Sequence, residues 1–463
     1  MSAKLKKILP FLSALPFVIS AAGYLIEGEN LLDALYHSVS LYYFQMSSQN
    51  FNILIEIARW TAPIATTAVI TCIFRSAWEC VRRVFLSHSV HCAAVYGNDR
   101  ITSADRRMKF IYSHDRVVRR CKKHVILFEH DRDSIDFYNQ NHENMRGSTY
   151  ICLREFPYTY LKVALHTVRQ KSGDQVIYFD AASATARMLW KKVRLWDTPS
   201  RTKSPVVTLI GSGHLAHSVM DSALLLNLFS AEQAVAYHVV SGDGLYRYHR
   251  EDMKLCNNDM IEYHPCDESR WELISNSDIV VLCEEVTPDE LITVSEKCHG
   301  KVYFYAPTIS ATDWLELPNC VPFGNNSDVL TYENICMNKL ISDAMEEHYN
   351  YLNDRSKTRE EAWNELSGFL KWSNISSADY SHVTADLYEL RHGSCDDESL
   401  IEELCELEHI RWCRLHYLDH WTYSPKRDDG KKQHHYLVDF NVLDEQTKEK
   451  DRAVVMSAVA KSK

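Results

Sequence analysis

Two long apolar stretches near the N-terminus constrain this chain more than any other feature. Residues 8–26 read ILPFLSALPFVISAAGYLI and carry no charge, so as a helix they would cross about one hydrocarbon core. Residues 53–74 form a second apolar stretch of similar length. Lysines precede the first stretch and arginines follow the second, which places both outer ends in the cytoplasm. We therefore expect two transmembrane helices, with both termini cytoplasmic.

A cleavable signal peptide is the alternative explanation of the first stretch, and the second stretch argues against it. The 14 cysteines show no C-x-x-C pairs, which indicates free thiols in a reducing compartment. The formal net charge of −11 argues against a protein that coats nucleic acid. We expect no metal site, because the 22 histidines form no H-E-x-x-H motif and the adjacent His434 and His435 should point apart.

The segment between the two stretches, residues 31–50, fits neither a soluble loop nor a membrane span. Its first half, LLDALYHSVS, reads as a short amphipathic helix, and a polar stretch follows before the second span. Irregular backbone at membrane depth is tolerated where it is buried in protein or lines water. A re-entrant pore helix followed by a constriction meets that condition.

The order span, DALYHSVS, polar loop, span resembles the pore module of two-span potassium channels. Residues 42–50 contain no glycine, however, whereas a carbonyl-lined potassium filter uses glycines. We therefore expect side chains to line the constriction and potassium selectivity to be lost. The predicted pore residues are Tyr42, Tyr43, Phe44, Gln45, Met46, Ser47 and Ser48. Glu56 and Arg59 lie three apart in the second span, where they can pair with each other or lie outside the hydrocarbon.

Residues 88–200 are predicted to form a first Rossmann-like lobe with a degenerate phosphate-binding turn. Four strand-like segments, at 91–99, 124–131, 148–156 and 174–181, are spaced for βαβ units. The first of them ends in YGND, which offers only Gly97 for a phosphate-binding turn. A nucleotide site and a lobe retained for packing both remain open.

Residues 204–330 are predicted to form a second Rossmann-like lobe. An apolar strand leads into Gly211-Ser212-Gly213-His214-Leu215-Ala216 and then a helix, which is G-x-G-x-x-A in the required strand–turn–helix context. Asp243 follows the next strand as the acid that would bind a ribose. The predicted cofactor-binding residues are Gly211, Gly213, His214 and Asp243, for NAD(H), ATP or ADP, or a cyclic nucleotide.

Two such lobes behind a two-span pore resemble the TrkA-N and RCK domains that regulate potassium conductance and uptake. That resemblance implies that a ligand bound by the lobes shifts a gate.

Residues 331–463 are predicted to be a helical linker followed by a module with the densest motif in the chain. The segment 406–452 closely resembles the RyR domain, the repeat named after ryanodine receptors. The matching residues are His409, Trp412, Trp421, Tyr423, Arg427, Asp428, Asp429, Lys431, Lys432, His434, Leu437, Val438, Glu449, Lys450, Asp451 and Arg452. Ser424 and His435 depart from the residues usual at their positions.

The resemblance implies a module that binds or senses nucleotides, and the residue types suit that chemistry. Indole and phenol rings stack on bases, basic side chains neutralise phosphates, and Asp428 can accept hydrogen bonds from a ribose or an amine. The predicted ligand-binding residues are Trp412, Trp421, Tyr423, Arg427, Asp428, Lys431, Lys432 and His434. The alternative is that the tryptophans are core residues and the charges form surface ion pairs.

The fold class expected is therefore multidomain: a transmembrane pore module at 1–85, two α/β lobes and a mainly helical C-terminal module. The function expected is a ligand-gated ion channel of the bacterial inner membrane, assembled as a homo-tetramer and gated by a nucleotide-type ligand. By analogy, such a chain resembles effectors of antiviral defence. No catalytic constellation stands out, so we expect no enzyme. The alternative is a membrane-anchored NAD(P)-dependent enzyme or a regulatory subunit without its own pore.

Overall fold

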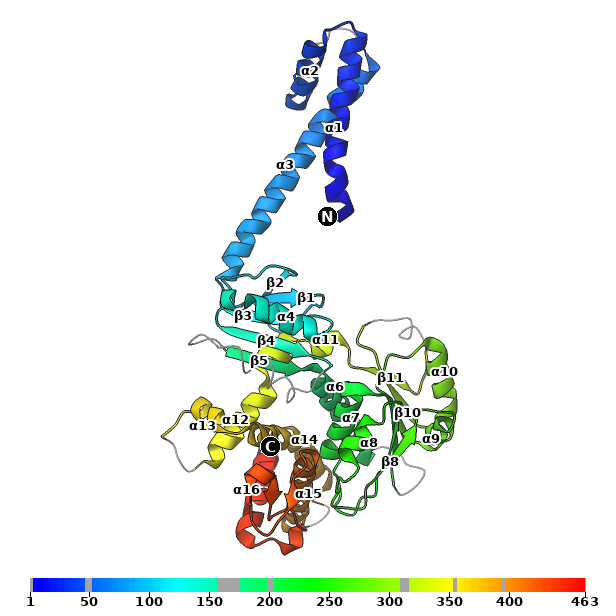
Figure 1. Cartoon of the computed structure of the whole chain (residues 1–463), viewed down its shortest axis with the longest axis vertical. Coiled ribbons are helices and arrows are strands. Elements are labelled where there is room, and N and C mark those ends of the chain that lie inside the picture. The colour runs from blue at the N-terminus through cyan, green and yellow to red at the C-terminus, as the bar shows by residue number, and fades with distance from the viewer. Residues whose placement is uncertain are drawn as a thin grey trace. The chain divides into compact units, whose positions relative to one another are not determined.

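The computed structural model describes residues 3–45, 52–155, 175–197, 204–308, 316–352, 356–393 and 396–462 (Figure 1). The chain divides into two compact units, Met1–Val90 and His91–Lys463. Each unit is described by itself.

The N-terminal unit is a helical hairpin with a short third helix beside it. Its elements are α1 (Ala3–Ile26), α2 (Leu31–Ser40), the 3-10 turn η1 (Leu41–Tyr43) and α3 (Ile53–Ser87). Helix α1 packs along both α2 and α3. The small core of this unit consists of Tyr24, Ala34, Leu41, Ile55, Ala58 and Ala62.

Specific contacts hold the hairpin together. A Cβ at Gly23 would lie 2.7 Å from Cγ1 of Ile55, so the close approach of α1 and α3 requires glycine there. The Asn52 side chain accepts the amide hydrogen of Leu54 at the start of α3 and donates to the Gly23 carbonyl of α1. Hence one side chain both caps one helix and ties it to the other.

One helix in the described part of the chain is long and apolar enough to cross a membrane. It is α3, which contains the predicted span 53–74 and continues to Ser87. Within the part of α1 whose side chains the structure describes, the apolar segment Ser13–Ile26 is shorter than that limit. The predicted pair of spans is therefore not confirmed.

The first α/β lobe contains a parallel sheet of five strands in the order β2-β1-β3-β4-β5. The strands are β1 (Cys92–Gly97), β2 (Lys109–Ser113), β3 (Lys123–Leu127), β4 (Ser148–Leu153) and β5 (Gln175–Asp180). Helix α4 (Asp131–Asn141) connects β3 to β4, and α6 (Ala181–Lys192) follows β5. The order 2-1-3-4-5 is the flavodoxin-like doubly wound order. All four predicted strands are present, and β2 was missed.

The second lobe contains a parallel sheet of six strands in the order β11-β10-β9-β6-β7-β8. Its strands are β6 (Val206–Ile210), β7 (Ala236–Ser241), β8 (Met260–Pro265), β9 (Ile279–Leu282), β10 (Lys301–Tyr305) and β11 (Cys320–Phe323). Its helices are α7 (Gly213–Leu226), α8 (Leu245–Arg250), α9 (Arg270–Asn276), α10 (Pro288–Lys297) and α11 (Asn326–Val329). Counted from β6, this is the 3-2-1-4-5-6 order of dinucleotide-binding sheets. The prediction of two Rossmann-like lobes is confirmed at the level of fold.

The remaining chain is mainly helical, as predicted. A π-helical turn at Glu333–Met337 is followed by α12 (Lys339–Tyr351), α13 (Arg359–Glu365), α14 (Gly368–Arg391), α15 (Asp397–Leu418) and α16 (Glu445–Ser462). Between α15 and α16 the chain forms two short paired strands, β12 (Thr422–Tyr423) and β13 (Gln433–His434), and the turns η6 (Asp429–Lys431) and η7 (Phe440–Val442).

A single hydrophobic core joins the second lobe to the C-terminal helices. Its buried residues come from α6, from α7 and strands of the second sheet, and from α14, α15 and α16. Figure 1 shows α14 and α15 beside α7. The C-terminal module is therefore packed onto the second lobe rather than tethered to it.

Candidate functional site

Aromatic rings and imidazoles gather where α15 meets the parallel pair of short strands β12 and β13. We call Phe369, Trp412, His416, Trp421 and His434 the aromatic–histidine cluster. The rings of Trp412 and His416 lie 3.8 Å apart, and those of Phe369 and Trp421 lie 4.9 Å apart. Trp421 is 6% exposed and packs with Cys413 and Leu437, so it is a core residue. Trp412 is half-buried.

Both imidazoles of this cluster are held neutral by burial. Burial lowers the pKa of His416 to about 3 and the pKa of His434 to about 4. His416 Nδ1 donates to the Trp412 carbonyl, whereas His434 Nδ1 accepts the amide hydrogen of Tyr436. Each ring therefore has a fixed tautomer. His434 and His435 do not point apart as predicted: their rings are parallel, with centroids 5.0 Å apart, because strand β13 ends at His434 and the chain turns at His435.

The charged residues predicted to bind phosphate already have carboxylate partners. Arg427 pairs with Asp429 at 2.6 Å, and Lys432 pairs with Asp419 at 3.0 Å. Lys431 lies 3.8 Å from Asp428, whose carboxylate also accepts the Lys431 amide hydrogen at the start of η6. Tyr423 is 51% exposed beside them. A phosphate would therefore compete with three surface carboxylates for these cations.

The predicted ligand-binding residues thus separate into two groups. Trp421 and His434 are buried in the module, whereas Tyr423, Arg427 and Lys431 lie on its surface, and Trp412, Asp428 and Lys432 are half-buried.

Other residues of the motif build the module. His409 Nε2 donates to the Val438 carbonyl, and its Nδ1 lies 3.5 Å from Asp451. Burial would lower the pKa of His409, but the hydrogen bond and charge of Asp451 raise it above the ordinary value. Arg452 pairs with Glu398 of α15 at 2.7 Å. These contacts fix α16 against α15.

A buried arginine that the sequence did not reveal connects α15 to the second lobe. Arg414 Nη2 donates to Asp259 Oδ2 and to Asn257 Oδ1, both at 2.7 Å. Its Nε and Nη1 donate to the carbonyls of Leu255 and Leu224. The side chains of Arg414 and Asp259 are both fully buried.

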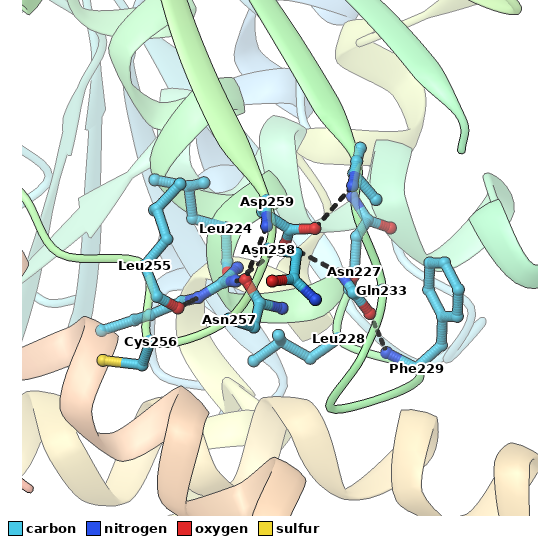
Figure 2. A network of polar contacts seen from close by, with 12 residues as sticks. Leu224, Asn227, Leu228, Phe229, Gln233, Leu255, Cys256, Asn257, Asn258 and Asp259 are labelled. Atoms are coloured by element: carbon cyan, nitrogen blue, oxygen red, sulfur yellow. Dashed lines mark hydrogen bonds and ion pairs between the residues drawn. The ribbon is translucent and has the colours of Figure 1, made fainter. Parts of the chain in front are cut away.

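Figure 2 shows the polar residues that surround Asp259. Asp259 also accepts hydrogen bonds from the Val235 amide at 2.6 Å and from Gln233 Nε2 at 2.8 Å. Gln233 in turn accepts the Phe229 amide hydrogen. The network is therefore anchored in the backbone of the lobe, and Arg414 lies two residues from both Trp412 and His416 on the same helix.

The predicted phosphate-binding turn has the expected backbone. Gly211 and Gly213 have φ of +141° and +74°, and a Cβ at Gly211 would lie 3.0 Å from the Cβ of Cys283. A side chain would thus be strained at both positions. The turn lies at the carboxyl edge of the sheet, between β6 and β9, where the strand order reverses and such sheets bind ligands.

Carboxylates face that turn, however. Glu284 Oε1 accepts the Ser212 amide hydrogen at 2.7 Å and the Ser212 hydroxyl at 2.6 Å. Burial would raise the pKa of Asp243, but hydrogen bonds from Ser241 and from the amides of Leu245 and Gly213 hold it below its usual range. The fold is compatible with dinucleotide binding, but in this conformation the residues present do not fit a pyrophosphate, because two carboxylates face the amides that it would use.

His214, the fourth predicted cofactor residue, joins the two lobes. Its Nε2 lies 2.9 Å from Oδ2 of Asp180, the residue that ends β5 and caps α6. Burial disfavours the charged form of both side chains. The hydrogen bond between them outweighs burial, so the pKa of His214 is raised and the pKa of Asp180 is lowered. His214 is therefore occupied by a contact between lobes.

In the first lobe the predicted turn residue serves packing. A Cβ at Gly97 would lie 2.1 Å from the Leu127 carbonyl oxygen, so glycine allows β1 and β3 to end side by side. The buried Asp131 accepts the amide hydrogens of Arg154 and Glu155 and thereby ties α4 to the end of β4. These contacts favour the packing interpretation of this lobe.

The predicted pore residues are described in part. The Tyr42 hydroxyl donates to the Ser13 carbonyl and accepts the Phe17 amide hydrogen, which ties η1 to α1. Tyr43 and Phe44 are 72% and 82% exposed, and Phe44 has a left-handed φ of +63°. Met46, Ser47 and Ser48 lie outside the described residues. Arg59 Nη1 lies 3.3 Å from Glu56 Oε1, so these two residues pair with each other.

Comparison with known proteins identifies the C-terminal module. Residues 394–461 match the family model of the RyR domain. No curated protein matches the chain. Among solved structures, the chain is similar to the malic enzyme of Entamoeba histolytica, with 10% identity, a TM-score of 0.30, and coverage of 100% of this chain and 91% of that chain.

The prediction that the chain is not an enzyme is contradicted by this structural neighbour, and we withdraw it. A TM-score of 0.30 gives no argument for a particular activity of this chain.

Proposed function

We propose that the chain is a ligand-gated ion channel of the bacterial inner membrane, with residues 1–85 forming the pore module. A nucleotide-type ligand would bind the RyR-like module on its cytoplasmic side. Such a channel fits the role of an effector in antiviral defence, in which opening depolarises the cell.

One observation carries this proposal. Helix α15 bears Trp412 and His416 of the aromatic–histidine cluster and also Arg414, which is buried against Asp259 of the second lobe. A ligand that displaces α15 would therefore also move the Arg414 guanidinium, which the second lobe holds through several hydrogen bonds. A coupling of about 1–3 kcal/mol between two such sites changes an equilibrium about 5- to 150-fold.

Helix α3 supports assembly into a homo-oligomer. Eight of its exposed apolar residues fall into two groups, at 53–64 and at 74–85. Within each group they recur at alternating spacings of three and four, the period by which helices pack along a seam. We call them the α3 stripe: Ile53, Ile57, Trp60, Ile64, Phe74, Trp78, Val81 and Phe85. Next to the stripe lies a hollow of about 870 Å³ lined by Phe44, Trp60 and Ile64 among others. Neighbouring subunits or membrane lipids would cover this face.

Ion flux from liposomes tests the function. The full chain is reconstituted, and NAD⁺, NADH, ATP, ADP and cyclic nucleotides are added in turn. We expect at least one of them to change the flux. We expect Tyr423→Ala to reduce the response, while Tyr248→Ala, which removes an exposed ring from α8, leaves it unchanged. Flux that no nucleotide changes, or equal responses of the two variants, contradicts the proposal.

A membrane-anchored NAD(P)-dependent enzyme is the second candidate. The 3-2-1-4-5-6 strand order, with two glycines at the turn after β6, favours it. Nicotinamide absorbance, recorded while the full chain is offered small alcohols and hydroxy acids, would reveal hydride transfer. Hydride transfer without ion flux would favour the enzyme over the channel.

A further inference from the structure

Two neighbouring strands of the second lobe bring two histidines and a glutamate together. His238 lies on β7 and is paired in register with Glu262 of β8, the edge strand of the sheet. His264 follows Glu262 by two residues, so its side chain leaves the same face of the sheet. None of these three residues belongs to the aromatic–histidine cluster or to the phosphate-binding turn.

The ligand atoms of the three side chains converge. His238 Nδ1 lies 3.0 Å from His264 Nε2 and 3.4 Å from Glu262 Oε2, and His264 Nε2 lies 3.5 Å from the same oxygen. Four ligands at about 2.0–2.1 Å from a tetrahedral zinc ion are about 3.3 Å from one another. The three atoms therefore match one face of a zinc coordination sphere.

Few charged side chains compete with a metal ion for the Glu262 carboxylate. No Lys or Arg ion pair to Glu262 occurs within the part of the chain that the structure describes. A hydrogen bond between the imidazoles satisfies one nitrogen on each ring, but it leaves the carboxylate without a cation unless a ring is protonated. A divalent ion would neutralise the carboxylate and bind Nδ1 of His238 and Nε2 of His264 at the same time.

We propose that His238, Glu262 and His264 bind a divalent first-row transition metal ion, with zinc as the best match. Two imidazoles and one carboxylate are the ligand set of zinc sites that keep their fourth position for water or a substrate. The Glu262 side chain is 51% exposed, so that fourth position faces solvent. Such an ion would also fasten the edge strand β8 to β7.

Cobalt binding to the full chain in detergent tests this site. Co²⁺ is titrated as a spectroscopic substitute for Zn²⁺, and the visible bands of a four-coordinate ion are followed. We expect one such ion per chain, without the near-ultraviolet thiolate bands that the free cysteines would produce. Competition with Zn²⁺ then gives the zinc affinity.

The variants separate this site from adventitious binding. We expect His238→Ala with His264→Ala to abolish the four-coordinate bands. We expect Glu262→Gln to weaken Zn²⁺ binding by about 100-fold or more, since loss of a residue that only hydrogen-bonds a metal ligand already costs about 10–100-fold. His299→Ala removes an exposed histidine from the same lobe and should change neither result. Circular dichroism establishes that each variant is folded.

Two results would overturn the proposal. One is Co²⁺ binding by folded His238→Ala/His264→Ala protein equal to that of the parent chain. The other is a parent chain whose only bound Co²⁺ shows thiolate bands.

Discussion

At the scale of the residue, Arg414 is a buried charge whose compensation lies on another part of the chain. Arg414→Met keeps the volume of the side chain but leaves Asp259 buried without its cation. We expect the free energy of unfolding to fall by about 3–5 kcal/mol. Denaturant unfolding of the full chain measures it. Arg427→Met, which breaks the exposed pair with Asp429, is the control and should change stability little.

Trp421 and Tyr423 differ by two positions but should respond differently to truncation. Trp421 is 6% exposed and touches Phe369 and His416, so Trp421→Ala should destabilise the chain by about 3–5 kcal/mol. Tyr423→Ala should leave the melting temperature unchanged and reduce only the response to ligand. Thermal unfolding measures the first effect. Equal melting temperatures of the two variants would refute the core assignment of Trp421.

The buried imidazoles make stability depend on pH. Burial lowers the pKa of His416 to about 3 and that of His434 to about 4, from an ordinary value of 6.5. The unfolded chain therefore binds more protons than the folded chain below pH 6.5, so this stabilisation is complete above that pH and is lost as pH falls toward 4 and 3.

The His434→Gln variant removes one of the two imidazoles that bind a proton on unfolding. We expect it to lose less stability than the parent chain when the pH of denaturant unfolding is lowered from about 6.5 to about 5. His249→Ala, an exposed histidine of α8, serves as the control. Identical slopes for His434→Gln and the parent would show that His434 does not titrate on unfolding.

At the scale of the element, the turn between β6 and α7 has the backbone of a phosphate site but faces a carboxylate. Glu284→Ala frees the Ser212 amide and removes a negative charge from the turn. We expect the affinity for NAD(H) or ADP to rise by about tenfold, the value of one charge-assisted hydrogen bond. Calorimetry on the full chain measures it.

Glu285→Ala provides the matched control for this change, since it removes the adjacent exposed carboxylate. No gain in affinity for Glu284→Ala over Glu285→Ala would mean that this turn serves the packing of β6 against α7 and not a nucleotide.

At the scale of the whole molecule, we propose that copies of the chain associate through the α3 stripe. Ile64 is 68% exposed on the stripe, and Ile70 is 46% exposed away from it. We expect Ile64→Asn to dissociate the oligomer in detergent, because a polar side chain there is left unpaired in an apolar contact. Ile70→Asn should not. Native mass spectrometry measures the oligomeric state, and an unchanged assembly in Ile64→Asn would assign the stripe to lipid.

Local patterns in the sequence determined much of this protein. The run at 53–74 predicted α3, four strand-like segments predicted β1, β3, β4 and β5, and the strand with two glycines predicted the turn after β6. The motif at 406–452 predicted the RyR-like module. Each of these signals depends on neighbouring residues, through the period of apolar positions or the backbone freedom of glycine, and such signals can be read along the chain.

Tertiary structure alone decided what the polar side chains do. The edge strand β8 was missed, and with it the approach of His238, Glu262 and His264, which lie up to 26 positions apart along the chain. Arg414 and Asp259 are 155 positions apart, and nothing near either residue indicates the other. Burial, which sets the pKa of His416 and makes Trp421 a core residue, likewise depends on segments that meet only when the chain folds.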